Sequence, residues 1–289
     1  MINFHRILFP ADLSRPSREA AAFVAAMSAR FNSKVFLLHS LEPPPSYYPI
    51  AAVATPGALK HSTETREAAQ HMLEGFAADF FSGVPMQPVL TEGDAANCIA
   101  TFARENDVDL IMMPTHGYGP FRRLLLGSVT AKVLHDVECP VWTGVHTDEM
   151  WSHIGTGWQR FLCAVDDDPR DIPLLKWAAQ FASEQGAVLQ VIHAAHATAS
   201  NPGHESASLR DLLVGVARER LSRLQAGAGT NFDIELVLGH ISDVVRQAAL
   251  DHRADLILIG RGAIQTGFGR LRSSAYAVIR DAPCPVISL

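Results

Sequence analysis

The sequence predicts an α/β protein made of two tandem domains, each an open parallel sheet with helices on both faces. Short apolar runs typical of buried strands alternate with segments whose apolar residues recur at helical spacing. This succession occurs twice along the chain. The length of 289 residues also favours two domains of ordinary size over one.

The first half contains five expected strands, each a short apolar run bounded by polar or turn-forming residues. They are Ile7–Ala11, Val35–His39, Pro88–Thr91, Leu110–Met113 and Pro140–Thr143. The expected helices are Arg15–Phe31, Glu64–Phe81, Ala95–Glu105 and one that starts at Gly127-Ser128. Ser14 and Ser128 are expected N-caps, because a short hydroxyl side chain can accept a hydrogen bond from an open N–H group.

Residues 42–60 are rich in proline, with Pro43-Pro44-Pro45, Pro49 and Pro56-Gly57. Proline lacks an N–H group and does not fit a regular ladder, so we predict a long irregular loop there. The loop follows the second strand, and we expect it to be mobile or to act as a lid near the first pocket.

The second half repeats the first. Asp166 corresponds to Asp12 (166 − 12 = 154) and His193 corresponds to His39 (193 − 39 = 154). Near the end of each half the sequence is Cys-Pro-Val, at Cys139 and Cys284 (284 − 139 = 145). The corresponding residues keep their order while the offset between them changes from 154 to 145. This indicates that one domain was duplicated and that its loops later changed in length. We predict domains at 1–146 and 160–289, joined by a linker at 147–159.

The amino-acid composition narrows the class of protein. Hydrophobic residues make up 48% of the chain and charged residues 19%, as in globular proteins with a sizeable core. The net charge of −6 argues against nonspecific binding to nucleic acid or an anionic membrane. No apolar run approaches a membrane span, and the N-terminus does not resemble a signal peptide. The four cysteines form no C-x-x-C pair, so we expect separate small core residues in a reducing cytoplasm.

The stretch from Asp109 to Val141 carries the strongest functional pattern. A buried strand is followed by a loop with Gly117 and Gly119, and then by a helix that starts at Gly127-Ser128. Glycines let the backbone approach a ligand, and the N–H groups and positive dipole end of a helix start attract anions. The pattern predicts a phosphate site, and a glycine turn without ligand is the alternative.

The same stretch resembles the signature of the universal stress protein family, which is Gly, two residues, Gly, nine residues and Gly-Ser. Gly117 and Gly127-Ser128 match this spacing, whereas Pro114 replaces the first glycine. Through the repeat, the resemblance extends over nearly the whole chain. It implies, in each domain, a five-stranded Rossmann-like sheet of the adenine nucleotide alpha-hydrolase type, with strand order 3-2-1-4-5. A ligand then belongs where the strand order reverses, between strands 1 and 4.

The resemblance also implies the ligand, which is ATP or a related adenine nucleotide, with or without Mg²⁺. Asp12 and the residues beside it are expected to contact the adenosine, and Ser40 to contact adenine through its backbone. The residues implied to bind the nucleotide are Pro10, Asp12, Ser40, Met113, Pro114, Gly117, Gly127, Ser128 and Val129. A carboxylate that serves a turn or helix cap is the alternative for Asp12.

The second domain departs from this pattern. Gly260-Arg261-Gly262 has one residue between its glycines, and Arg272-Ser273 replaces Gly-Ser. An arginine where the backbone must approach a phosphate would fill that space or supply a cation. We therefore expect nucleotide binding in the first domain only.

Other candidate sites have simpler explanations. His39 and His193 end apolar strands and are expected to be hydrogen-bonded core residues. Arg122 and Arg123 could screen phosphate charge or lie on a solvated loop, and His116 borders the phosphate site. Asp166-Asp167-Asp168 resembles a magnesium cluster, but we expect Asp166 to repeat Asp12 and its neighbours to cap the next helix. No metal-ligand spacing, Walker loop or nucleophile elbow occurs.

Three functions remain. The first is a cytoplasmic stress-response sensor or regulator that binds nucleotide without being an enzyme. The second is a nucleotide-free structural factor that works through protein partners, and the third is a slow ATPase. The final strands, Val141–Thr143 and Val286–Ser288, are sheet edges that need a partner. Since duplicated halves offer each other the same surface, we expect an intramolecular pseudo-dimer and leave a homodimer open.

Overall fold

The computed structural model describes residues 1–42, 56–115, 126–144, 158–195, 207–261 and 273–289. Within them the chain forms two compact units, one within residues 3–139 and the other built mainly from Pro140–Leu289. We call these the N-terminal unit and the C-terminal unit. None of the described helices combines the length and hydropathy that crossing a bilayer requires.

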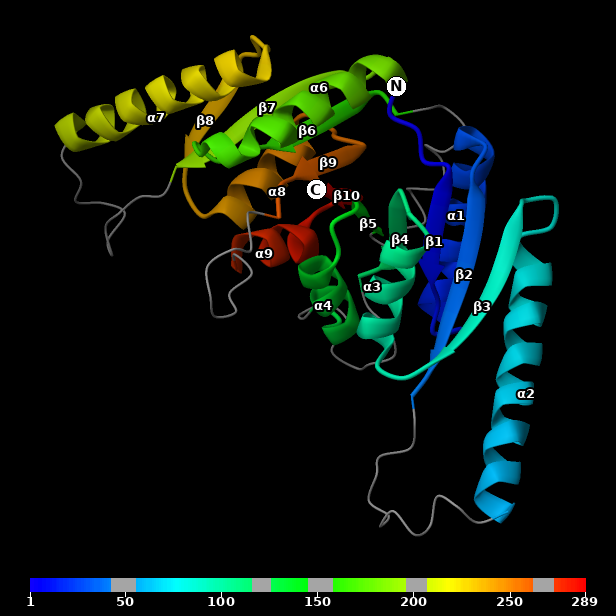
Figure 1. The fold of residues 1–289 in the computed structure, drawn as a ribbon. Coiled ribbons are helices and arrows are strands. Elements are labelled where there is room, and N and C mark those ends of the chain that lie inside the picture. The colour runs from blue at the N-terminus through cyan, green and yellow to red at the C-terminus, as the bar shows by residue number, and fades with distance from the viewer. Residues whose placement is uncertain (43–55, 116–125, 145–157, 196–206, 262–272) are drawn as a thin grey trace. The chain divides into compact units, whose positions relative to one another are not determined.

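The N-terminal unit alternates strands and helices (Figure 1). Its elements are β1 (Arg6–Pro10), α1 (Arg15–Phe31), β2 (Lys34–Leu41), α2 (Pro56–Phe80), β3 (Met86–Glu92), α3 (Ala95–Glu105), β4 (Leu110–Pro114) and α4 (Ser128–Asp136). The strands are parallel, in the order β3-β2-β1-β4. Helix α1 packs on α2, and α3 packs on α4.

The C-terminal unit repeats this plan. Its elements are β5 (Val141–Gly144), β6 (Arg160–Ala164), the short 3₁₀ helix η3 (Pro169–Asp171), α6 (Ile172–Gln185), β7 (Val188–Ala195), α7 (Ala207–Ala228), β8 (Ile234–Leu238), α8 (Ile241–Asp251), β9 (Leu256–Ile259), α9 (Ser273–Asp281) and β10 (Val286–Ser288). The strand order is β8-β7-β6-β9-β10, with β5 beyond β10. Strands β6 to β10 therefore have the predicted order 3-2-1-4-5, which confirms the fold class.

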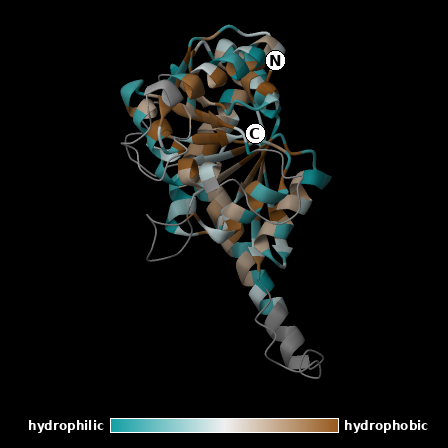
Figure 2. Cartoon of the chain, turned by 90° about the vertical axis from the view of Figure 1, so that its left-hand side faces the viewer, coloured by the Kyte–Doolittle hydropathy of each residue, from teal (hydrophilic) through white to brown (hydrophobic). Residues whose placement is uncertain are grey.

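The strands form the core of each unit because both faces of each sheet are covered. Ile7, Leu8 and Phe9 of β1 are fully buried, as are Leu256, Ile257 and Leu258 of β9. Such continuous apolar runs are typical of parallel sheets with helices on both faces. Figure 2 shows the same distribution, with hydrophobic residues on the strands and hydrophilic residues on the outer helix surfaces.

The predicted irregular loop at residues 42–60 is wrong for its last five residues, since α2 starts at Pro56. Proline fits the first turn of a helix, where its missing N–H group would have no intrahelical partner and its φ is already suitable. The Pro56-Gly57 pair therefore begins a helix. The rest of that prediction, including a mobile or lid-like loop, concerns residues 43–55, which lie outside the described ranges.

Strand β5 pairs with β10 inside the C-terminal unit. The pseudo-dimer expected from the sequence stays a prediction. The pairing is antiparallel and places Trp142 opposite Ile287 and Thr143 opposite Val286. The Thr143 hydroxyl donates to the Val286 carbonyl at 3.3 Å. Trp142 is buried, and its ring lies 5.1 Å from that of Trp158. The edge of β10 is thus covered by a strand encoded in the first half of the sequence.

Of the four cysteines, Cys163 and Cys284 are buried, whereas Cys98 and Cys139 are partly exposed. The prediction of separate core cysteines is therefore right for the first pair only. All four are free thiols. Burial raises the pKa of both the Cys163 and the Cys284 thiols, which keeps them in the unreactive protonated form.

Candidate functional site

A cavity of about 460 Å³ opens in the N-terminal unit at the carboxyl ends of β1, β2 and β4. These strand ends flank the point where the strand order reverses, because β2 and β4 pair with opposite edges of β1. Open α/β sheets bind ligands at this point. The starts of α3 and α4 complete the wall. The position follows directly from the topology of the sheet.

The cavity brings together the predicted site residues that the structure describes. They are Pro10, Asp12, Ser40, Met113, Pro114, Gly127, Ser128 and Val129. Gly117 lies outside the described residues, as do His116, Arg122 and Arg123. The lining also includes Glu42, Ala95 and Ile99, which sequence reasoning missed. Contact of all these residues with a ligand stays a prediction.

Asp12 is held in place by the start of α1. Its Oδ1 accepts hydrogen bonds from the Ser14 N–H at 3.0 Å and the Ser17 hydroxyl at 2.6 Å. Ser14 is the N-cap of α1, as predicted. Among the described residues no donor is bonded to Oδ2, so this oxygen can accept a hydroxyl of a ligand. The turn-forming role considered as an alternative for Asp12 is therefore present, and it leaves one oxygen available.

Helix α4 begins with open N–H groups beside the cavity. Its N-cap is Gly127, which carries no side chain to cap the first turn, so the prediction of Ser128 as N-cap is wrong. The reason is the hydrogen bonding of the backbone: the Gly127 N–H donates to Thr115 O, and the Gly127 carbonyl already accepts from the Ala131 N–H. A helix start without a capping side chain can donate N–H groups to an anion.

Pro114 ends β4 and is linked to α4 through a hydrogen bond of its carbonyl group, since proline has no N–H group. The Pro114 carbonyl accepts a hydrogen bond from the Thr130 hydroxyl at 3.2 Å, and both residues are buried. This contact fixes the first turn of α4 against the end of the strand. The loss of the glycine at this position therefore does not disconnect the two elements.

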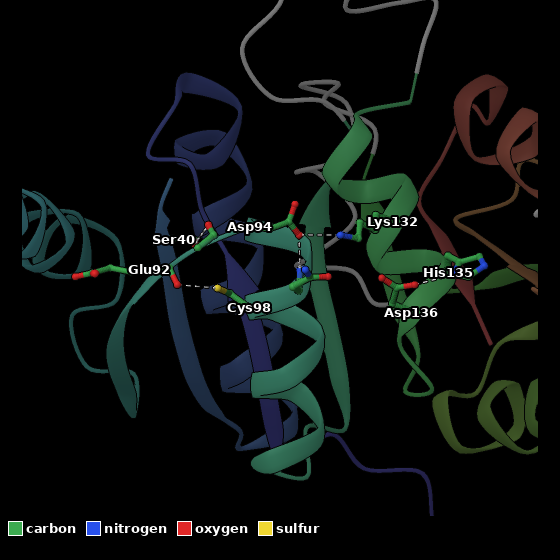
Figure 3. Close-up of polar contacts among 9 residues, drawn as sticks. Ser40, Glu92, Asp94, Cys98, Lys132, His135 and Asp136 are labelled. Atoms are coloured by element: carbon green, nitrogen blue, oxygen red, sulfur yellow. Dashed lines mark hydrogen bonds and ion pairs between the residues drawn. The ribbon is translucent and has the colours of Figure 1, made fainter. Parts of the chain in front are cut away.

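The opposite end of the cavity lies at the end of β2. The Ser40 hydroxyl donates to the Gly93 carbonyl at 3.0 Å (Figure 3). His39 Nδ1 lies 2.8 Å from the Ala11 carbonyl, and in the C-terminal unit His193 Nδ1 lies 2.9 Å from the Val165 carbonyl. The prediction of hydrogen-bonded core histidines is confirmed for His193, which is buried, whereas His39 is hydrogen-bonded but only partly buried and lines the cavity. The matching bonds show that the repeat extends to single contacts.

Among the described residues, the cavity at the corresponding position of the C-terminal unit has a volume of about 30 Å³. Asp166 lines it, as Asp12 lines the first cavity. Such a volume holds one water molecule and no nucleotide. Arg272, predicted to close this site, lies outside the described residues.

Asp171 occupies the place of Ser17 in this smaller cavity (171 − 17 = 154). Its Oδ2 accepts the Asp166 N–H at 2.6 Å, whereas in the first half the Ser17 hydroxyl oxygen accepts the Asp12 N–H at 3.3 Å. Its Oδ1 lies so close to Gly260 that a Cβ there would come within 2.9 Å. The carboxyl group thus lies against the backbone at Asp166 and at Gly260, and the constant offset of 154 was the sequence signal for it.

Burial raises the pKa of Asp171 to about 7, and the negative charge of Asp168 adds to the effect, while Arg170 opposes it. Asp167 and Asp168, the neighbours of Asp166, have separate partners. Asp168 caps η3 and pairs with Arg170, and Asp167 pairs with Arg220 at 3.0 Å. The described residues contain no group of three side chains placed to hold a metal ion.

Stability should depend on pH through Asp171. Its pKa in the folded state, about 7, exceeds the ordinary value of 3.8, so folding takes up a proton between those values. The wild type should therefore lose stability as pH rises from about 4 to about 7, by on the order of 4 kcal/mol, because the folded state binds more protons.

Asp171→Ser copies the first half and Asp171→Asn keeps the shape, and both should remove this loss. Urea unfolding of the wild type and both variants at pH 5 and pH 8 measures it. Equal pH dependence in all three proteins would show that Asp171 does not hold the proton.

Comparison with known proteins supports the repeat seen in the sequence. The model of the universal stress protein family matches residues 3–143 and again residues 157–288. Universal stress protein Sll1654 of Synechocystis is 34% identical over 142 residues, which are 49% of this chain and 85% of that protein. A universal stress protein of Thermus aquaticus is 30% identical over 141 residues, which are 48% of this chain and 96% of that protein.

Several solved structures align with both halves at once, and one of them serves as the example. It is a universal stress protein from Archaeoglobus fulgidus, with a TM-score of 0.66 and 20% identity, and the alignment covers 99% of this chain and 96% of that one. At this identity the likeness concerns the fold alone. The two curated relatives named above, by contrast, each match about half of the chain.

Proposed function

The chain belongs to the universal stress protein family, with a family domain in each half, and from this premise we propose that it binds ATP or a related adenine nucleotide. The proposed site is the cavity of the N-terminal unit, and the proposed role is that of a stress-response sensor or regulator. The observation that carries the proposal is the cavity itself, which joins Asp12 to the open start of α4.

Each part of a nucleotide has a suitable partner in the cavity. The open N–H groups of α4 suit the phosphates, because a helix start carries partial positive charge. Asp12 Oδ2 suits a ribose hydroxyl, and the end of β2 at Ser40 suits the adenine.

We propose that the nucleotide binds in the N-terminal unit only and that the protein does not hydrolyse it. As far as the described residues form it, the cavity of the C-terminal unit is too small for a nucleotide, which supports one site per chain. Mass spectrometry of the nucleotide extracted from freshly purified protein tests the ligand, and titration calorimetry should give close to one nucleotide per chain. Two equivalent sites would contradict the assignment, and steady release of ADP would favour the slow ATPase.

Asp12→Ala should weaken ATP binding about tenfold, because the ribose loses a charge-assisted hydrogen bond. Asp166→Ala is the matched control, since it removes the corresponding carboxylate from the C-terminal unit. Titration calorimetry on both variants measures the effect. Equal losses of affinity in the two proteins would place the nucleotide elsewhere.

A further inference from the structure

The proposed nucleotide site has an unbalanced charge. Its described lining contains two carboxylates, Asp12 and Glu42, and no lysine or arginine. The start of α4 supplies a charge of only about +0.5. A triphosphate carries several negative charges, so a nearby full cation would decide how strongly its outer phosphates are held.

Lys132 is a cation close to this cavity, although it is not part of the lining. It lies on α4, one turn after Ser128, and its Nζ is 2.9 Å from Asp94 Oδ1 (Figure 3). Asp94 is the N-cap of α3, where Oδ1 also accepts the Asn97 N–H at 2.9 Å. Ala95, the next residue, lines the cavity. The ion pair therefore bridges the two helix starts that flank the proposed phosphate end.

The contact between Lys132 and Asp94 is easily exchanged. The side chains are 43% and 53% exposed, and ion pairs at such positions contribute little to stability. The stem of lysine is flexible, and its ammonium group can move between acceptors. Asp94 would keep its capping bond to Asn97 after Lys132 leaves, so α3 does not depend on the pair.

The C-terminal unit lacks both partners. The N-cap of α8, which corresponds to Asp94, is His240. The fifth residue of α9, which corresponds to Lys132, is Ala277. The ion pair is thus absent from the half whose described cavity is too small for a nucleotide, as expected if the pair serves binding.

We propose that Lys132 breaks its ion pair with Asp94 and binds the outer phosphates of the nucleotide. The protein thereby prefers ATP over AMP. Asp94 holds the ammonium group close to the cavity in the free protein and competes with the phosphates for it. This inference rests on the proposed function and adds a residue that determines specificity.

Titration of the full chain with ATP, AMP and adenosine tests the proposal. Lys132→Gln should lower the affinity for ATP about ten- to a hundredfold and leave that for adenosine unchanged. Lys132→Arg should keep most of the preference for ATP. Asp94→Asn should raise the affinity for ATP several-fold, because asparagine caps helices as well as aspartate and no longer competes for Lys132. Lys34→Gln removes another exposed lysine, whose partner is Gln87, and is the control.

The outcomes are distinguishable. If the wild type binds none of the three compounds, the proposed function itself fails. If the wild type binds ATP but Lys132→Gln lowers the affinities for ATP and adenosine equally, Lys132 only supports the fold and the inference is wrong. A lower affinity for ATP in Asp94→Asn would also overturn it, because the pair would then act as a fixed unit.

Discussion

Gly127→Arg should abolish ATP binding, with a loss of affinity greater than a hundredfold, or about 3 kcal/mol. The change copies Arg272 of the second half into the first. Gly127 lines the cavity at the N-cap of α4, where an arginine side chain would occupy the space of the phosphates. Its φ of −58° suits any residue, so the substitution fills the site without straining the backbone.

Calorimetry measures this loss, and circular dichroism shows whether the protein is folded. Gly127→Ala is the control, because it adds a single methyl group at the same backbone position and should cost far less affinity. If the arginine variant is folded and binds ATP as the wild type does, the phosphates do not bind at the start of α4.

Trp142→Ala should lower the free energy of unfolding by about 3–5 kcal/mol, the usual cost of removing a large buried aromatic side chain. Trp142 is 1% exposed and lies on β5 opposite Ile287 of β10. Its ring contacts Trp158, whose ring lies 6.2 Å from that of Phe161. The substitution leaves a cavity in the core beside the paired strands β5 and β10.

Trp177→Ala makes the same chemical change in the same unit. Trp177 lies on α6, is only partly buried, and contacts Phe181 at 4.7 Å between ring centroids. This variant should lose about 1–2 kcal/mol, because less apolar surface returns to water. Urea unfolding followed by circular dichroism compares the two. Equal losses would mean that β5 contributes no more to the unit than a helix surface does.

The sequence predicts the elements well where a single periodicity governs them. The apolar runs of β1 and β4 are buried on both faces, and an apolar run followed by Asp12 is enough to place that carboxylate at a strand end. The repeat then places Asp166 and His193 by their offset. These features depend on local pattern and on one comparison within the chain.

The features that sequence reasoning missed depend on contacts between distant segments or on local competition. Lys132 and Asp94 are 38 residues apart, and no pattern in either segment indicates the other. Gly127 and Ser128 are both acceptable N-caps, and the hydrogen bond from Gly127 to Thr115 selects the glycine. The raised pKa of Asp171 arises from burial, which exists only in the folded unit.

The pairing of β5 with β10 also has a consequence for synthesis. Thr143 leaves the ribosome 143 residues before its partner Val286 (286 − 143 = 143). At roughly 5–20 residues per second, β5 waits about 7–30 s for that partner. During this interval its apolar edge can pair with another nascent chain, as open edges do. Synthesis of residues 286–288 therefore ends the interval in which β5 lacks its partner strand and is exposed to aggregation.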